Sequence, residues 1–281
     1  MSEPDTTPAT TSLDPAAPDT ASPAHRRAIG IDVGGTGVKA AVVDLATGEL
    51  ASPRIREKTP QPSTPEAVLE TVAQIVDRLA EGGHVDPAMP AGAGLPGVVK
   101  RGRLLTAANI DKGWVDFPAE EALATLLGRP VRLINDADAA GLAEGSFGAA
   151  KGVPGTVLLL TIGTGIGSAL LTDGKLMDST EFGHVPYRRK SVELWISGAA
   201  RERRGIGWRR WAGEFSEFLA QVEAWFWPDL IILGGGVSKE YAKYGTWLKS
   251  RAPIVTARYL NTSGIVGAAL AAGGHEDAPT D

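Results

Sequence analysis

The sequence predicts an α/β protein built from two similar lobes with a ligand-binding cleft between them. Apolar runs typical of strands alternate along the chain with segments that have helical spacing. A unit of strand, Gly/Thr-rich turn and strand at residues 29–44 recurs about half a chain later, at residues 156–172. Such a recurrence indicates an approximate duplication. A cleft between two similar lobes is a preferred place for a ligand.

The composition is that of a globular protein of one or two domains, with 281 residues, 43% hydrophobic and 22% charged. The absence of cysteine excludes disulfides, thiolate nucleophiles, iron-sulfur clusters and Cys-ligated zinc. The formal net charge of -5 argues against general nucleic-acid binding. No apolar run approaches the length of a membrane span, and the acidic start lacks the apolar core of a secretory signal. We therefore expect a soluble, cytoplasmic protein without a membrane partner.

The first lobe is expected over residues 27–133, after a tail. Residues 1–26 are rich in Pro, Ala, Ser and Thr and have too few large apolar residues to offset their ordering entropy, so we expect them to be disordered. The lobe is predicted to contain strands at 28–33 and 38–44 around a glycine turn, a strand within 51–58, a helix over 65–79, strands and turns over 93–110, a helix at 119–127 and a strand at 131–134.

The second lobe is expected over residues 134–264. Residues 265–281 are expected to form a final helix that packs back on the first lobe, followed by a tail. The elements predicted for this half are strands at 156–162 and 168–172, helices at 192–203 and 209–226, a strand at 229–233 followed by glycines and a helix, a strand at 254–259, and a Gly/Ala-rich helix from residue 263.

Three glycine clusters stand at the ends of predicted strands. Glycine allows backbone N–H groups to approach a polyphosphate closely, and threonine adds a hydroxyl donor. The spacing fits neither a Rossmann fingerprint, because the second cluster leads into a strand, nor a Walker sequence. The clusters are Asp32-x-Gly34-Gly35-Thr36-x-x-Lys39, Gly163-Thr164-Gly165-x-Gly167 and Gly234-Gly235-Gly236.

Four motifs, taken in order, resemble the ROK family of sugar kinases and repressors. They are the Asp32–Lys39 motif, the segment Asn135-Asp136-Ala-Asp138-Ala-Ala, the Gly163–Ser168 turn and Glu181-Phe-Gly183-His184. Residues 106–114 and 135–144 are closer still to the polyphosphate glucokinase branch of this family. The resemblance, over about residues 27–272, implies the two-lobed actin-like ATPase fold, which is ribonuclease H-like. It also implies transfer of a phosphoryl group from inorganic polyphosphate or ATP, with Mg²⁺, to the 6-hydroxyl of glucose. We also expect a homodimer.

In this resemblance, Asp136 is the general base that takes the proton of the sugar hydroxyl as the phosphoryl group arrives. The alternative is an aspartate that caps the Ala-rich helix after it. The residues that resemble sugar ligands are Asn109, Asn135, Glu181, His184 and Glu193. Those that resemble phosphate or nucleotide ligands are Gly34, Gly35, Thr36, Lys39, Thr164, Gly165, Gly235 and Gly236, although Lys39 equally fits a solvated strand position, and Asp32 resembles the Mg²⁺ ligand.

The chain departs from most of the family after the Glu181–His184 motif, where a cysteine-rich zinc site is usual. Without cysteine no such zinc site is expected, and the polyphosphate branch also tends to lack it. The spacing of Glu193 before Ser197-Gly198 is retained, which is why we assign a sugar ligand to Glu193.

A basic stretch at residues 188–210 stands out in an acidic chain. It is either a solvated helix face or a path for a long polyanion, since guanidinium groups bind phosphate in a bidentate manner. Nearby tryptophans are interpreted as core or dimer-interface residues. The basic residues are Arg188, Arg189, Lys190, Arg201, Arg203, Arg204, Arg209 and Arg210, and the tryptophans are Trp195, Trp208, Trp211, Trp225 and Trp227.

Three alternative functions remain at the level of sequence. The first is an ATP-dependent kinase of another hexose. The second is a non-catalytic, sugar-sensing member of the ROK family, which needs a DNA-binding helix-turn-helix, whereas the residues before the first hairpin are few and rich in proline. The third is an actin-like or chaperone ATPase, for which the sugar-binding residues would have no purpose.

Overall fold

The computed structural model describes residues 27–274 of the chain. The tails predicted at 1–26 and beyond residue 274 lie outside these residues. Within the described part of the chain, none of the helices combines the length and the apolar character needed to cross a membrane.

The first half of the chain forms a five-stranded sheet in the order β3-β2-β1-β4-β7. Its antiparallel part is a meander of β1 (Arg27–Gly34), β2 (Gly37–Asp44) and β3 (Ile55–Glu57). The strands β4 (Ala91–Leu95) and β7 (Val131–Asn135) then run parallel to β1. Because they are parallel, β1, β4 and β7 end at the same edge of the sheet. Strand β7 carries this sheet past the expected lobe boundary at 133.

The second half repeats this topology in the order β10-β9-β8-β13-β14. Strands β8 (Thr156–Ile162), β9 (Ile166–Thr172) and β10 (Lys175–Met177) form the antiparallel meander. Strands β13 (Leu230–Gly234) and β14 (Ile254–Thr256) run parallel to β8. The same strand order in both halves confirms the duplicated α/β fold predicted from the repeated hairpin.

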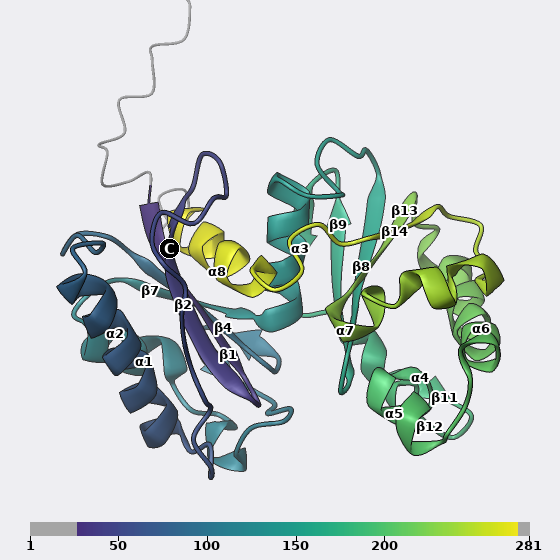
Figure 1. Cartoon of the computed structure of the whole chain (residues 1–281), viewed down its shortest axis with the longest axis horizontal. Coiled ribbons are helices and arrows are strands. Elements are labelled where there is room, and N and C mark those ends of the chain that lie inside the picture. Colours follow the sequence, from purple (N-terminus) through teal and green to yellow (C-terminus); the bar gives the residue numbers. More distant parts are fainter. Residues whose placement is uncertain (1–26, 275–281) are drawn as a thin grey trace, which may run out of the picture.

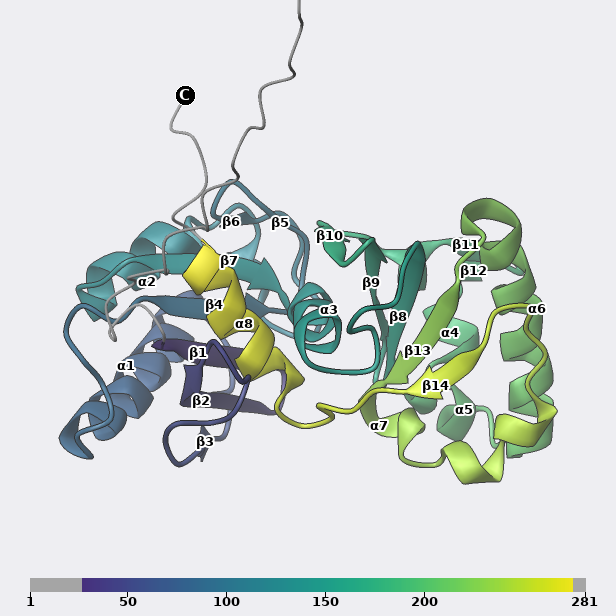
Figure 2. The same ribbon diagram turned by 90° about the horizontal axis from the view of Figure 1, so that it is seen from above.

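Helices cover both faces of each sheet (Figures 1 and 2). Helices α1 (Pro65–Glu81) and α2 (Ala119–Leu127) bury apolar side chains on the outer face of the first sheet, and α6 (Trp208–Phe226) does so on the second. Helices α3 (Asp136–Ser146) and α8 (Ser263–Gly273) lie between the two sheets and contact each other. The end of β7 and the start of α3 therefore lie where the two halves meet.

Helix α8 lies very close to the inner face of the first sheet. A Cβ atom at Gly30 would be 1.9 Å from the backbone oxygen of Ile265, and one at Gly92 would be 1.7 Å from that of Ala268. Glycine on β1 and β4 thus permits a backbone approach that no other residue allows. Although it ends the sequence, α8 packs on strands of the first half.

The helix α1 shows how local signals fix an element. Thr64 is its N-cap and accepts a hydrogen bond from the N–H of Ala67, and Pro65 occupies the first turn, where its missing N–H costs nothing. The apolar positions that predicted the helix are all buried: Val68, Val72, Ile75, Val76 and Leu79.

The predicted helix over 192–203 is wrong as a single element. It breaks at Ser197, whose extended backbone and side-chain oxygen cap a new helix by accepting a hydrogen bond from the N–H of Ala200. The third strand lies within the predicted stretch 51–58, and the strand predicted at 254–259 is shorter and ends at Thr256. The remaining short elements are β5 (Val99–Lys100), β6 (Arg103–Leu104), η2 (Lys112–Trp114), η3 (Phe182–His184), β11 (Pro186–Tyr187), β12 (Lys190–Ser191), α4 (Glu193–Ile196), α5 (Gly198–Arg203), α7 (Gly235–Ser238), η4 (Tyr241–Lys243) and η5 (Gly245–Trp247).

Candidate active site

A cavity of about 260 Å³ lies between the two halves, beside the end of β7 and the turn between β8 and β9. It brings together segments that are far apart in the sequence, as expected for a cleft at the carboxyl ends of parallel strands. The predicted site residues in its lining are Asn109, Asn135, Asp136, Thr164, Gly165, Glu181, His184, Glu193 and Gly235.

Asp136 is the first residue of α3, and it is not the helix cap. The cap is Asn135, whose Oδ1 accepts hydrogen bonds from the N–H groups of Ala137 and Asp138 at 2.8 and 3.0 Å. One Asp136 oxygen also lies 2.9 Å from the Ala137 nitrogen. Since capping is supplied by Asn135, the carboxylate of Asp136 at the cavity wall has capacity left for a ligand.

The surroundings of Asp136 favour its protonated form. Burial is the main cause, the charges of Asp32 and Glu181 add to it, and together they raise the pKa to about 7. A carboxylate with this pKa is a stronger base than an ordinary aspartate and is still about half ionised at neutral pH. That is the property required of a general base for an alcohol.

His184 lies between two carboxylates in the lining of the same cavity as Asp136. Its Nε2 is 3.6 Å from an oxygen of Glu181, and its Nδ1 is 3.6 Å from an oxygen of Glu193. Burial and the charge of Glu193 raise the pKa of Glu181, while His184 lowers it. Two acceptor carboxylates around an imidazole offer several hydrogen-bonding atoms to the neighbouring hydroxyls of a sugar.

The two asparagines differ in how much of their side chain is available. The Asn135 amide nitrogen donates to the carbonyl of Gly97 at 3.0 Å, so one N–H of this buried side chain remains for a ligand. Asn109 has a left-handed backbone with φ 61°, and a Cβ at Gly35 would be 2.7 Å from its carbonyl oxygen. The tip of the first hairpin therefore rests against the segment that carries Asn109.

The first hairpin does not line this cavity. Lys39 donates to Asp32 at 2.7 Å, so the predicted phosphate ligand and the predicted metal ligand pair with each other. Thr36 is exposed at the tip. Asp32 is nevertheless close enough to Asp136 for its charge to raise the pKa of that group. The hairpin thus borders the site and is not in its wall.

A second cavity, of about 500 Å³, lies on the other side of Gly163 and Thr164. It contains the predicted Gly236, Arg201 of the basic stretch, and Trp208 and Lys243, which were not predicted as ligands. Two glutamates, Glu202 and Glu240, also line it. The Arg201 guanidinium stacks 4.0 Å from the centre of the Trp208 ring. The basic stretch in the sequence pointed to Arg201, but Trp208 was interpreted as a core or interface residue.

A third cavity, of about 600 Å³, continues outward from the first and shares Asn109, His184 and Glu193 with it. Its outer wall contains Lys112 and Arg203 together with half-exposed aliphatic side chains. Those side chains are Leu105, Val115 and Leu194.

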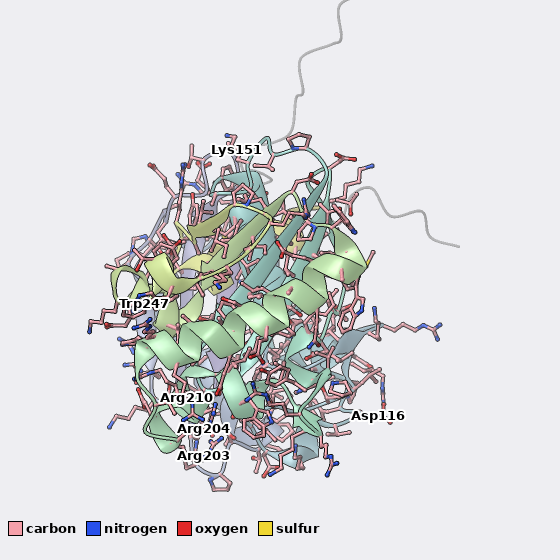
Figure 3. All side chains as sticks on the ribbon, turned by 90° about the vertical axis from the view of Figure 1, so that its right-hand side faces the viewer. Asp116, Lys151, Arg203, Arg204, Arg210 and Trp247 are labelled. Carbon is pink, nitrogen blue, oxygen red and sulfur yellow. The ribbon has the colours of Figure 1, made fainter. Side chains whose placement is uncertain are left out.

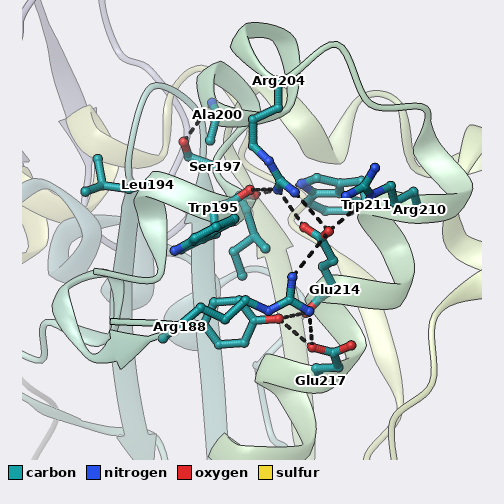
Figure 4. Close-up of polar contacts among 12 residues, drawn as sticks. Arg188, Leu194, Trp195, Ser197, Ala200, Arg204, Arg210, Trp211, Glu214 and Glu217 are labelled. Atoms are coloured by element: carbon teal, nitrogen blue, oxygen red, sulfur yellow. Dashed lines mark hydrogen bonds and ion pairs between the residues drawn. The ribbon is translucent and has the colours of Figure 1, made fainter. Parts of the chain in front are cut away.

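Much of the basic stretch is neutralised by two glutamates of α6 (Figure 4). Glu214 is almost fully buried, and its carboxylate accepts two hydrogen bonds from Arg204, at 2.6 and 2.9 Å. Arg210 lies 3.3 Å from Glu214, and Arg188 lies 2.7 Å from Glu217. The hydrogen bond from Arg204 is the largest influence that lowers the pKa of Glu214. Figure 3 shows the side chains of Arg203, Arg204 and Arg210 near one another in this region.

Residues 27–274 contain no cluster of three or more His, Cys, Asp or Glu side chains that suits a metal ion. Mg²⁺ is usually held by one or two carboxylates plus the phosphates of a substrate and does not require such a cage. The half-buried carboxylate of Asp32, beside Asp136, fits that kind of site.

The sequence profile of the ROK family matches residues 28–204 of the chain. The chain belongs to the ROK family. It is 45% identical over 248 residues to the polyphosphate glucokinase of Mycobacterium tuberculosis strain H37Rv, a match that covers 88% of this chain and 91% of the relative.

Solved structures of this family have the same fold. The inorganic polyphosphate/ATP-glucomannokinase of Arthrobacter sp. strain KM matches with a TM-score of 0.82 and 46% identity, over 86% of this chain and 96% of that one. A ROK-family glucokinase from Streptomyces griseus, in complex with glucose and AMPPNP, matches with a TM-score of 0.72 and 28% identity, over 86% and 98%. The family and the two-lobed sugar-kinase fold predicted from the motifs are confirmed.

Proposed function

We propose that this ROK-family enzyme phosphorylates glucose at the 6-hydroxyl, with inorganic polyphosphate or ATP as the phosphoryl donor. The observation that carries the proposal is the first cavity. It joins a carboxylate of raised pKa, Asp136, with the Glu181–His184–Glu193 group and with the glycine turn at Thr164. The relatives named for polyphosphate and for glucose support the substrates.

The roles of the residues follow from where they lie. Asp136 accepts the proton of the sugar hydroxyl while the phosphoryl group is transferred. Glu181, His184 and Glu193 bind the other hydroxyls and hold the reacting one toward Asp136, and Asn109 and Asn135 add amide donors. The backbone N–H groups near Thr164 and Gly165 stabilise the charge of the transferred phosphate.

The donor phosphates would lie between the two hairpin turns. The first turn contributes Gly34, Gly35, Thr36 and Lys39, and the second contributes Thr164 and Gly165. Asp32 would hold Mg²⁺ together with the donor phosphates, and the bound ion would supply positive charge next to the group in transfer. Because Lys39 pairs with Asp32, we propose that it exchanges this partner for phosphate when the donor binds.

The rest of the donor would lie in the second cavity, beyond Thr164. Gly235 and Gly236 border the place of a nucleoside, and Arg201 and Lys243 supply positive charge for phosphates farther along a chain. A long polyphosphate reaches such charges, and the short phosphate tail of ATP does not. Of the basic stretch, we therefore assign Arg201 to the donor, because its ion pair with the exposed Glu202 is long, at 3.8 Å. We assign Arg204 to the fold, because it is bound to the buried Glu214 at 2.6 Å.

The proposal is tested by steady-state kinetics of the purified full chain with glucose and either ATP or long-chain polyphosphate. Arg201→Gln should raise the KM for polyphosphate about tenfold and that for ATP less than threefold, since roughly one charge-assisted contact is lost. Arg203→Gln, in the outer cavity, is the matched control and should change neither value. Arg201→Lys should recover part of the loss.

Two outcomes would contradict the donor assignment. Equal losses for both donors after Arg201→Gln would place Arg201 in the shared phosphate site, and no loss for either would remove it from the donor path. Wild-type enzyme that phosphorylates another hexose with a much higher kcat/KM than glucose would support the alternative of a different hexose kinase. A wild-type protein that binds sugar without turnover would support a sugar sensor.

The cytoplasm is the proposed location, since ATP and polyphosphate are intracellular donors. The homodimer expected from the sequence stays a prediction. Sedimentation of the purified protein measures it directly.

A further inference from the structure

A second aspartate on α3, Asp138, is buried without an evident structural purpose. It is only 1% exposed, and its Oδ2 accepts a hydrogen bond from the backbone N–H of Ser179 at 2.8 Å. Its Oδ1 is buried and has no hydrogen-bond partner among residues 27–274. A buried carboxylate with a single hydrogen bond is costly, so a group of this kind needs an explanation.

The usual reason for an acidic residue in the first turn of a helix does not account for Asp138. In a capping box, the third residue of the helix reaches back to the N–H of the cap. Asp138 is in that position after the cap Asn135, but its hydrogen bond goes to Ser179, 41 residues farther along the chain. It therefore connects α3 to another segment.

That segment leads directly to a proposed sugar ligand. Ser179 has a left-handed backbone with φ 63°, which is unfavourable for a non-glycine residue and must be held by its surroundings. Its hydroxyl donates to the carbonyl of Val99 at 3.1 Å. Thr180 is bonded to Ser168 through both its hydroxyl and its carbonyl. Glu181 follows immediately after these two anchored residues.

Asp138 also lies among other carboxyl groups. Burial, with the charges of Asp178, Glu181 and Asp136, raises the pKa of Asp138 to about 7. The hydrogen bond to Ser179 needs only an oxygen at this position, which an amide could also present. A buried carboxyl group with a raised pKa is typical of functional sites.

We propose that Asp138 is a positioning residue for the sugar site. By holding the N–H of Ser179, it fixes Glu181 relative to Asp136, which is two residues away on the same helix. One hydrogen bond thereby keeps the general base and a sugar ligand on the neighbouring segment at a fixed distance and orientation. This role rests on the proposed function, in which Glu181 binds the sugar.

The test compares Asp138→Ala with Asp138→Asn in the full chain. The alanine variant loses the hydrogen bond to Ser179 and should raise the KM for glucose about tenfold or more, with less than a threefold change in the KM for the donor. The asparagine variant can still present an oxygen to Ser179 and should keep the KM for glucose within about threefold of wild type. Asp178→Asn, an exposed change in the same segment, is the control and should be neutral.

Hydrogen-deuterium exchange of residues 177–182 provides a readout that needs no turnover. The alanine variant should exchange faster in this segment, and the asparagine variant should exchange as wild type does. If Asp138→Ala does not fold, Asp138→Ser replaces it, because the serine hydroxyl is too short to reach Ser179.

The outcomes separate this proposal from the proposed function. Unchanged exchange and an unchanged glucose KM in the alanine or serine variant would overturn the positioning role, as would equal increases in the KM values of glucose and donor. An asparagine variant as impaired as the alanine variant would also overturn it, because the charge would then matter and not the tether. Wild-type protein without glucokinase activity would refute the proposed function, and the exchange experiment would still test whether Asp138 holds the segment.

Discussion

Replacing Asp136 by asparagine should make the protein inactive and, at the same time, more stable. The native structure raises the pKa of Asp136 from its ordinary 3.8 to about 7. Below pH 3.8 the carboxyl group is protonated in both the folded and the unfolded state, so it makes no difference to stability. Between pH 3.8 and 7 the carboxyl group is mostly ionised in the unfolded state and mostly protonated in the folded state. The free energy of unfolding therefore falls as the pH rises through this range. Above pH 7 the group is ionised in both states, and the free energy of unfolding is lowered by the full amount.

The magnitude follows from the same pKa values. The rise from 3.8 to about 7 is about 3 pH units, which at about 1.4 kcal/mol per unit corresponds to about 4 kcal/mol. This is an upper limit, since Asp136 lines an open cavity and water there stabilises its charge. We expect Asp136→Asn to raise the free energy of unfolding at pH 8 by about half of this limit, roughly 2 kcal/mol. This corresponds to an increase in Tm of about 4–8 °C. Loss of the general base should lower kcat by about 10²- to 10⁴-fold.

The assay is thermal unfolding of wild type and Asp136→Asn at pH 5 and pH 8, together with glucose phosphorylation. The difference in Tm should be larger at pH 8 than at pH 5, because the penalty grows between these values. Asp178→Asn removes an exposed carboxylate nearby and should show no such pH dependence. A variant no more stable than wild type at pH 8 would refute the argument from burial, and a variant with wild-type kcat would exclude Asp136 as the base.

Three further predictions concern the same helix and cleft. First, kcat/KM for glucose should rise with pH and level off above about 7, since Asp136 acts in its ionised form; a value independent of pH between 5 and 8 would contradict this. Second, Glu144→Gln should lower the free energy of unfolding by about 2 kcal/mol in denaturant titrations, because its buried carboxylate accepts backbone N–H bonds from Ala149, Arg258 and Tyr259. Third, saturating glucose should reduce the radius of gyration in small-angle scattering, and an unchanged radius would count against closure of the cleft.

The fold could be predicted from the sequence because its signals are local. The repeated hairpin, the Thr64-Pro65 helix start and the spacing of buried residues in α1 need no knowledge of distant contacts. The break at Ser197 also has a local cause, the capping bond to Ala200, and Ser-Gly in the sequence was its signal. The close approach of α8 to Gly30 and Gly92 depends on tertiary packing, which spacing alone does not reveal.

The site was predictable to the extent that its residues follow strand ends. Asp136, Glu181 and His184 were found through their motifs, and the cavity contains all three. Which charges remain available could not be predicted, because it depends on partners distant in the sequence. Arg204 is bound to Glu214 and Lys39 to Asp32.

Two buried acids of α3 connect this helix to segments that are distant in the sequence. Asp138 ties this helix to the segment of Glu181, and Glu144 ties it to the crossover at Arg258 and Tyr259 that leads into α8. The proposed base Asp136 and the proposed sugar ligand Glu181 are therefore connected through one helix. The hairpin with Asp32 belongs to the same sheet as β7, which leads into Asp136, and α8 packs on both β1 and α3. If the cleft closes on glucose, we therefore expect Asp32 and Asp136 to stay close to each other, because the strands that lead to them belong to one sheet.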